Sequence, residues 1–186
     1  MEYLLRSLQS FDTSSRPKLE PVPIVPFLHA FAKMIRADVV QRGVDLVVVA
    51  DESVGSAVAE PRALHQVMLN LVTNALDALA GRPDAILRIS ATRRTHVRIQ
   101  VADNGPGIAP ASRARVFRPF YTTKPKGTGL GLAITRKLVT FMRGTLEVES
   151  APGGGALFVV ALDPHEPQES SRRAATVRPP PPRGDR

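Results

Sequence analysis

Apolar residues recur along the chain with two different periods, one helical and one typical of strands. Helical spacing marks residues 26–42, 60–80 and 129–142. Valine-rich or alternating stretches predict strands over 45–50, 85–91, 96–102, 145–149 and 156–162. The pattern therefore predicts helices and strands interleaved over most of the chain, with the Gly-, Pro- and Thr-rich residues 103–128 mainly in loops.

The first long helix is predicted to begin near Pro26, a residue suited to a first helical turn, and to stop at Gly43. The apolar stripe expected to face the core consists of Phe27, Phe31, Met34, Ile35 and Val39.

Both ends of the chain have a different character. Residues 1–11 have leucines at helical spacing and resemble the end of an amphipathic helix, whereas residues 12–25, rich in proline and small polar residues, are predicted to be a linker. From residue 165 to 186, proline, arginine and serine predominate, which predicts a disordered tail. The folded domain is therefore expected over 26–164.

Composition narrows the possible functions. The 186 residues suit one domain with tails. The absence of cysteine excludes thiol chemistry and disulfides. The sequence has no run of about 18 apolar residues, so no membrane span is predicted. Of the net charge of +8, residues 27–163 contribute +6, but their arginines are scattered and only 5% of all residues are aromatic. We therefore expect an anionic small ligand rather than nucleic acid.

The helix over 60–80 has an unusual polar row. Asn70, Asn74 and Asp77 lie within roughly 60° of one another, opposite the apolar arc and beside Gln66. Asparagine is a poorer helix former than the lysine and glutamate that usually fill a solvated face. A row of amide and carboxylate oxygens suits a hard cation such as Mg²⁺, although a plain solvated face is the alternative.

Two glycine-rich loops follow. Asp103 ends a strand and is followed by Gly105 and Gly107, so a flat ring can approach a carboxylate that accepts from an exocyclic amine. The alternative is an ordinary Asn-Gly turn. Gly127, Gly129 and Gly131 then precede a helix close to two lysines, an arrangement typical of an anion site.

Four stretches resemble, in the same order, the sequence boxes of sensor histidine kinases. Asn70–Ala75 resembles the N box, Asp103–Gly107 the first glycine box, Phe117–Lys124 the F box and Gly127–Leu132 the second glycine box. The similarity runs from about residue 26 to 164 and is greatest to the nitrogen-regulatory and dicarboxylate-sensing subgroup.

The resemblance implies a two-layer α/β sandwich of the Bergerat type, shared with gyrase, heat-shock protein 90 and mismatch-repair ATPases. Three main helices would pack on a mixed sheet, with residues 109–126 as a mobile lid whose Phe117 and Phe120 grip or release the core. The ligand would be Mg-ATP, with Asn74 holding the metal and Asp103 contacting the adenine amine, while Asn70 and Lys124 would be catalytic. The ATP-binding residues implied are Asn70, Asn74, Asp77, Asp103, Gly105, Gly107, Ile108, Phe120, Thr122, Thr123, Lys124, Gly127, Thr128, Gly129, Leu130, Gly131 and Leu132.

Asn70 distinguishes related activities. ATP-hydrolysing relatives have a glutamate at this position to activate water, and an asparagine amide is no useful base at pH 7. The site is therefore expected to donate the γ-phosphoryl to another acceptor, since phosphoryl transfer needs mainly positioning and charge neutralisation. A nucleotide-binding regulatory module without kinase activity is the alternative, and a gyrase-like ATPase is a weaker one.

The resemblance has departures. None of His29, His65, His96 and His165 stands in the family's acceptor context, so the phosphoacceptor is expected on a dimerisation helix outside this chain, in a longer kinase. Partners implied are those dimerisation helices and the receiver domain of a response regulator, and the implied location is cytoplasmic even for a membrane-anchored parent. Asp77 stands where many of these kinases have lysine, and Ala156 replaces a usual threonine after the glycines 153–155.

Overall fold

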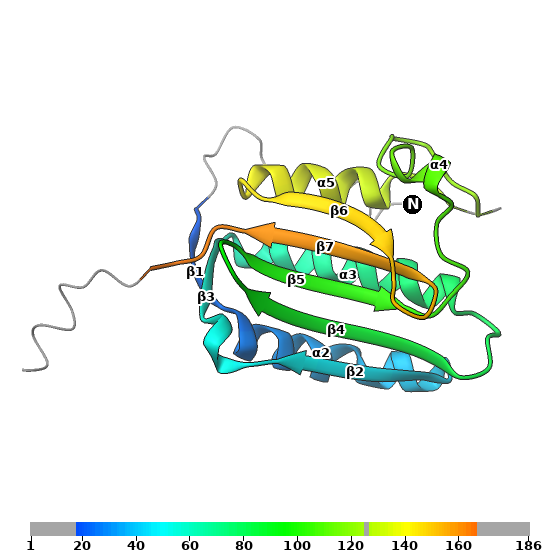
Figure 1. The fold of residues 1–186 in the computed structure, drawn as a ribbon, viewed down its shortest axis with the longest axis horizontal. Helices are drawn as coiled ribbons and strands as arrows, with labels where there is room; N and C mark the ends of the chain where they lie inside the picture. The colour runs from blue at the N-terminus through cyan, green and yellow to red at the C-terminus, as the bar shows by residue number, and fades with distance from the viewer. Residues whose placement is uncertain (1–17, 125–126, 167–186) are drawn as a thin grey trace, which may run out of the picture.

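The computed structural model describes residues 18–124 and 127–166, which form a five-stranded mixed sheet with helices along one face (Figure 1). The strand order is β2-β4-β5-β7-β6, in which β2 and β4 run parallel and the other neighbours antiparallel. A second, two-stranded sheet pairs β1 with β3 at one end. The elements are β1 (Glu20–Pro23), α2 (Ile24–Gln41), β2 (Val44–Ala50), the 3-10 turn η1 (Glu52–Val54), β3 (Ser56–Ala59), α3 (Pro61–Ala78), β4 (Ala85–Arg93), β5 (Val97–Asp103), α4 (Pro110–Arg113), α5 (Gly131–Phe141), β6 (Thr145–Ser150) and β7 (Ala156–Leu162).

Helices α2, α3 and α5 lie side by side behind the sheet in Figure 1, so the expected two-layer α/β sandwich is confirmed. The core lies between the layers. Every second residue of the two central strands β4 and β5 points into it, as the alternating pattern predicts. These inward apolar residues are Ala85, Leu87, Ile89, Ala91, Val97, Ile99 and Val101.

Helix α3 is the element on which the rest of the site depends. Its side-chain N-cap is Glu60, which accepts from the backbone N–H groups of Arg62 and Ala63, and Pro61 occupies the first turn. Its apolar arc is buried throughout, which leaves the row of Asn70, Asn74 and Asp77 on the other side. The buried arc consists of Ala63, Leu64, Val67, Met68, Leu71, Val72, Ala75 and Leu76.

Helix α2 corrects two expectations. It begins at Ile24, two residues before Pro26, and Met34 is 52% exposed instead of buried in the predicted stripe. The buried arc centres on Leu28 and Ile35, and at 100° per residue this places Met34 roughly 110° away from the core.

The predicted linker is partly wrong. Within residues 12–25, Glu20–Pro23 forms strand β1, which pairs with β3, a strand that the analysis of the sequence missed. Both are only four residues long, and β1 contains two prolines, which a short edge strand tolerates. The predicted helix over 1–11 and most of the predicted tail lie outside the described residues.

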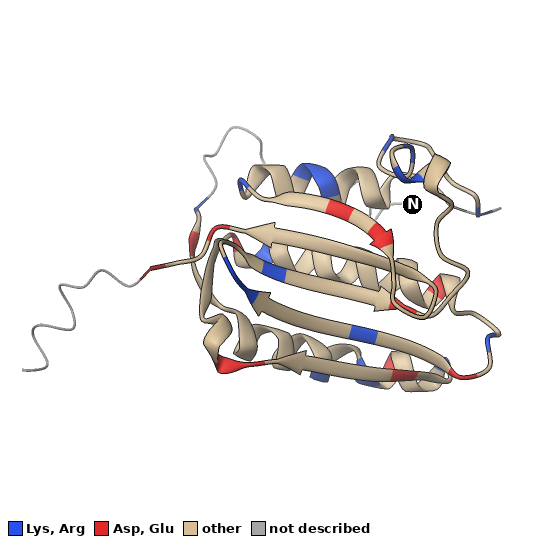
Figure 2. Cartoon of the chain, in the orientation of Figure 1, with Lys and Arg blue, Asp and Glu red and all other residues tan. Residues whose placement is uncertain are grey.

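The far end of the domain extends slightly beyond the predicted boundary at 164. Pro164 bridges to Ala57, and the backbone N–H of His165 donates to Ser56, so the chain still pairs with β3 there. Among the described helices, none is both long and apolar enough to cross a membrane. Figure 2 shows basic and acidic segments interspersed over the strands and helix ends on the visible face.

Candidate functional site

Strand β5 ends on a buried acid. Its inward positions alternate with its outward ones, and the fourth inward position after three apolar residues is Asp103, which is only 5% exposed. Carboxylate oxygen Oδ1 accepts from the backbone N–H groups of Gly105 (2.9 Å) and Ala156 (3.2 Å). Oxygen Oδ2 has no partner in the described part of the chain and is not buried, so it remains available to an external donor.

Burial also sets the protonation behaviour of this carboxyl. Desolvation raises the pKa of Asp103 above its ordinary value of 3.8, and the two backbone N–H donors and the charge of Arg82 act in the opposite direction. Ionising a buried carboxyl is costly because the carboxylate loses its hydration. A hydrogen bond donated by a ligand amine would replace part of that hydration, so Asp103 is suited to accept one.

The loop that contains Gly107 packs against the loop that contains Gly155, beside Asp103. Gly155, at φ +90°, lies so close to the Asp103 carbonyl that a Cβ there would overlap the backbone. Gly107, at φ +73°, faces Gly155, and a Cβ on it would lie 2.9 Å from the Gly155 carbonyl oxygen. The glycines therefore allow three backbone segments to meet where a side chain would separate them.

Asn104 fixes this loop to the sheet. Its side-chain oxygen accepts from the backbone N–H of Ile86 (2.8 Å), and its Nδ2 donates to the carbonyl of Asp84 (2.7 Å). The sequence analysis missed this role and that of the Ala156 N–H. The signal present in the sequence was an Asn-Gly pair directly after a strand, whose amide can replace ladder hydrogen bonds at the strand end.

The polar row of α3 brings the predicted boxes together, one after another along the helix. Asn70 accepts from Gln66 (3.0 Å) and donates from Nδ2 to Thr135 Oγ1 (3.3 Å) and the Gly131 carbonyl (3.4 Å) on α5. Further along, Asn74 and Asp77 accept from Lys124.

At the end of α3, Ala78 abuts the loop after β5. A Cβ on Gly105 would lie 3.2 Å from the Ala78 carbonyl oxygen. About two turns of one helix thus contact the second glycine box, the F-box lysine and the first glycine box in turn.

The Lys124 ammonium makes the shortest polar contact with the row of Asn70, Asn74 and Asp77. It donates to Asp77 Oδ2 (2.7 Å) and Asn74 Oδ1 (3.2 Å), so both oxygens converge on one position. Amide and carboxylate oxygens converging in this way form a donor set that fits a hard divalent cation.

Residues 109–124, hereafter the lid, leave the body after Ile108 and include the short helix α4. Phe117 packs against the core and meets the Phe158 ring edge-on at 6.5 Å between centroids, with the Arg136 guanidinium 5.5 Å above its own ring. Phe120 is 77% exposed at φ +64°, so of the two phenylalanines expected to grip the core, only Phe117 does so here.

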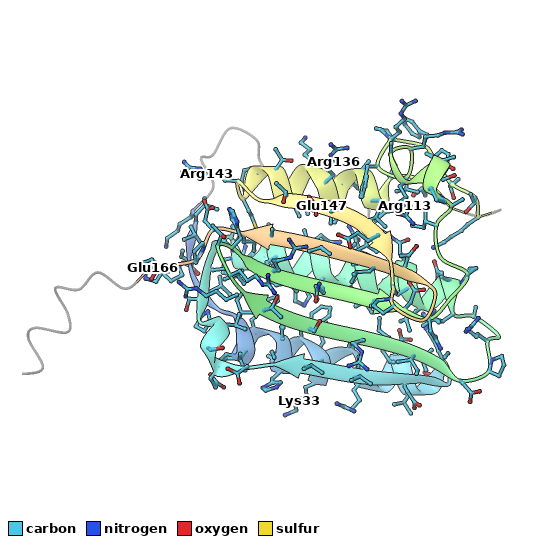
Figure 3. The ribbon with its side chains drawn as sticks, in the orientation of Figure 1. Lys33, Arg113, Arg136, Arg143, Glu147 and Glu166 are labelled. Atoms are coloured by element: carbon cyan, nitrogen blue, oxygen red, sulfur yellow. The ribbon has the colours of Figure 1, made fainter. Side chains whose placement is uncertain are left out.

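Arg113 also attaches the lid to the body, donating to Ser150 Oγ (2.7 Å) and more weakly to the Ile108 carbonyl (3.4 Å). Figure 3 shows Arg113 beside the end of β6 and Arg136 on α5. Neither contact was evident from the sequence, because both join residues that are distant along the chain.

The second glycine loop leads directly into α5, which begins at Gly131 rather than near Gly129. Leu130, the N-cap residue, offers no side-chain acceptor to the first turn, so backbone N–H groups there remain available to an anion. Gly129, at φ +66°, packs on the Phe120 backbone, Thr128 Oγ1 accepts from Leu130, and Leu132 packs partly against the core.

Of the remaining predicted site residues, Thr122 accepts through Oγ1 from the Lys124 backbone N–H (3.0 Å) and Gly127 lies against the Thr122 side chain, whereas Thr123 is exposed.

A separate open hollow of about 450 Å³ lies between the lid and the outer side of α5. It contains no predicted ATP-binding residue and is lined by Phe117, Pro119, Ala133, Arg136, Lys137, Thr140 and Phe141.

Residues 59–166 match the family described as "Histidine kinase-, DNA gyrase B-, and HSP90-like ATPase". The sensor histidine kinase ZraS of Klebsiella oxytoca is 33% identical over 145 residues, which cover 78% of this chain and 31% of that protein. The signal transduction histidine-protein kinase AtoS of Escherichia coli is 30% identical over 165 residues, 89% of this chain and 27% of that protein.

Solved structures of histidine kinases share the fold of this chain. The catalytic domain of the histidine kinase ThkA superposes with a TM-score of 0.70 at 26% identity, covering 78% of this chain and 95% of that one. Full-length ShkA in complex with AMPPNP superposes with a TM-score of 0.68 at 31% identity, covering 80% of this chain and 32% of that one.

The chain therefore belongs to the family of histidine kinase-, gyrase- and HSP90-like ATPases, and its α/β sandwich is the histidine-kinase type of ATP-binding domain. It spans only about 30% of the length of the curated relatives named here.

Proposed function

We propose that this chain is the ATP-binding catalytic domain of a two-component sensor histidine kinase, which transfers the γ-phosphoryl of Mg-ATP to a histidine on a dimerisation helix of the parent kinase. The observation that carries the proposal is the convergence of Gly131, Lys124 and Gly105 on successive positions of α3. Similarity to ZraS and AtoS, both named as histidine kinases, supports the reaction class.

Adenine recognition falls to Asp103 in this proposal. Oδ1 is held by two backbone N–H groups, which orients the free Oδ2 toward a ligand amine. The backbone contacts around Gly107 and Gly155 leave a surface that a planar ring can approach. ShkA is described in complex with AMPPNP, an adenine nucleotide analogue, which favours the same ligand class here.

The phosphates would be bound along the polar row of α3, between the start of α5 and Lys124. Backbone N–H groups at the start of α5 and the Lys124 ammonium supply positive potential there. Asn74, with Asp77 close by, has the oxygen donors that fit Mg²⁺, and the metal when bound would neutralise phosphate charge.

Asn70 favours transfer over hydrolysis. Its side-chain amide is already engaged with Gln66, Thr135 and the Gly131 carbonyl, and an amide in any case removes no proton from water at pH 7. Its contribution is to hold α5 against α3, which fixes the first-turn N–H groups. This arrangement disfavours the gyrase-like ATPase alternative.

The acceptor is proposed to lie outside the described residues, since all four histidines belong to other parts of the fold. His65 contacts Met34 and the Phe31 ring, and His96 lies 3.9 Å from Asp163. His29 is exposed on α2, and His165 pairs through its backbone with Ser56. A response-regulator receiver domain would then take the phosphoryl from the acceptor histidine.

Calorimetric titration of the full chain with a non-hydrolysable ATP analogue, with and without Mg²⁺, tests the binding step. We expect Mg²⁺-dependent micromolar binding that Asp103→Asn weakens and the exposed control Asp45→Asn leaves unchanged. A second assay adds the dimerisation-helix fragment of the parent kinase and radiolabelled ATP. Acid-labile label on that fragment supports the kinase, whereas binding without transfer favours the regulatory module, and steady phosphate release favours an ATPase.

A further inference from the structure

Three side chains of the lid contact three different elements of the body among the described residues. Arg113 reaches β6 and the Ile108 carbonyl, Phe117 packs on Phe158, and Lys124 reaches α3 (Figure 3 labels Arg113). The first two attachments involve none of the residues proposed to bind phosphate or metal. Only the Lys124 attachment coincides with them.

That attachment and a bound Mg²⁺ require the same oxygen. Lys124 Nζ lies 3.2 Å from Asn74 Oδ1, and a magnesium ion coordinated by this oxygen would lie at about 2.0–2.1 Å from it. An ammonium at hydrogen-bond distance from this oxygen and a divalent cation coordinated by the same oxygen would lie close together and repel each other. Occupancy of Asn74 by the ammonium therefore disfavours occupancy by Mg²⁺, and the reverse.

Asp77 holds the lysine in this position. Its contact with Nζ is the shorter of the two and joins opposite charges, whereas Asn74 is neutral. The other carboxylate oxygen, Oδ1, lies 4.0 Å from the Arg42 guanidinium at the end of α2, so Asp77 lies between two cations. Asn74 and Asp77 stand three residues apart on one helix face, which lets a single ammonium contact both.

Resting on the proposed function, we propose that Asp77 is a positioning residue that holds Lys124 on Asn74, and that this Asp77–Lys124 latch competes with Mg²⁺ for the nucleotide site. Binding of Mg-ATP then requires the latch to open, and the released lysine is free to meet the phosphates. The latch ties the last part of the lid to α3, so its opening frees the lid at the same moment that the nucleotide arrives.

Hydrogen exchange of the lid, measured by mass spectrometry on the full chain without added nucleotide, tests the latch. An exposed ion pair typically contributes little, so Asp77→Asn and Lys124→Met should each speed exchange over residues 114–124 by about 1.5- to 5-fold. The double variant should exchange no faster than either single variant, because both remove the same contact. Asp45→Asn, the same chemical change at an exposed position of β2, should leave lid exchange unchanged. Unchanged exchange in both single variants, or effects that multiply in the double variant, would overturn the latch.

Mg²⁺ titration provides the second measurement. The titration is made at a fixed saturating concentration of non-hydrolysable ATP analogue. The Mg²⁺ concentration for half-maximal Mg²⁺ binding should fall by about 1.5- to 5-fold in Lys124→Met, because the ammonium that competes for Asn74 is gone. An unchanged or higher requirement for Mg²⁺ contradicts competition. If the analogue does not bind to any variant, the proposed function fails, whereas the exchange experiment still decides whether the latch exists.

Discussion

The loop after β5 and the lid that follows it are held in different ways. Around Asp103 the contacts are made by backbone atoms: Gly155 lies on the Asp103 carbonyl, and the carboxylate accepts two backbone N–H groups in a buried setting. The lid instead relies on side chains that are partly exposed, namely Arg113, Phe117 and Lys124. Backbone packing tolerates almost no change in shape, whereas exposed side-chain contacts are individually weak.

This difference suits the two ends of the ATP molecule that we propose as the ligand. A fixed pocket recognises a rigid ring, while a segment with weak, separable attachments can release and rebind around a flexible triphosphate. Local opening is expected to be easiest where buried apolar contacts are fewest, which here is the lid.

The strongest test of the fixed half replaces a glycine. Gly155→Ala should cost about 3 kcal/mol or more of unfolding free energy, because its Cβ collides with the Asp103 backbone at a φ that alanine avoids. Gly153→Ala is the matched control, with a similar φ of +86° but no heavy atom within 4 Å, and should cost about 1–2 kcal/mol. Urea unfolding followed by circular dichroism measures both, and equal losses would show that the close approach is unimportant.

Asp103→Asn separates recognition from folding. Loss of a charge-assisted hydrogen bond to the ligand amine should weaken binding of the ATP analogue by about 10- to 100-fold. The variant keeps an Oδ1 acceptor for Gly105 and Ala156, so its unfolding free energy at pH 7 should not fall. Calorimetry with parallel thermal melts checks this, and a large loss of stability would assign Asp103 to folding instead.

The same residue predicts a pH dependence. Because burial raises the pKa of Asp103 above 3.8, the native state keeps this proton to higher pH than the unfolded chain. Stability from this group is thus present below pH 3.8 and declines as pH rises through the raised pKa. The unfolding free energy of the native chain minus that of Asp103→Asn should therefore decrease upward from about pH 4 and then level off. A difference that rises with pH over that range contradicts the assigned direction.

The smallest effect is expected in the lid. Arg113→Gln removes the contact with Ser150 and should speed lid hydrogen exchange by about 1.5- to 5-fold without shifting the global melting temperature. Arg118→Gln, at an exposed position whose side chain has no partner among the described residues, provides the control. A fall in global stability with Arg113→Gln would mean that the lid folds with the core and would remove the contrast between the two halves.

Much of the fold was predictable because its main elements have strong local periods. The apolar arc of α3 and the alternation along β4 and β5 were confirmed, and the same alternation places Asp103 on an inward position. The errors fall where local signals are short or ambiguous. Strands β1 and β3 have four residues each, and the buried arc of α2 is rotated by about a sixth of a turn from the predicted stripe.

The sequence by itself determined the family, the two glycine loops and the polar row of α3, since these depend on residue type and spacing within single segments. Only the tertiary structure decided that Lys124 lies on Asn74 and Asp77, that Asn104 fastens the loop to β4, and that Phe120 is exposed while Phe117 is packed. Each of these contacts joins positions that are far apart in the chain or depends on how the lid folds back. No local period encodes such pairings, because they arise from how packed layers bring distant segments together.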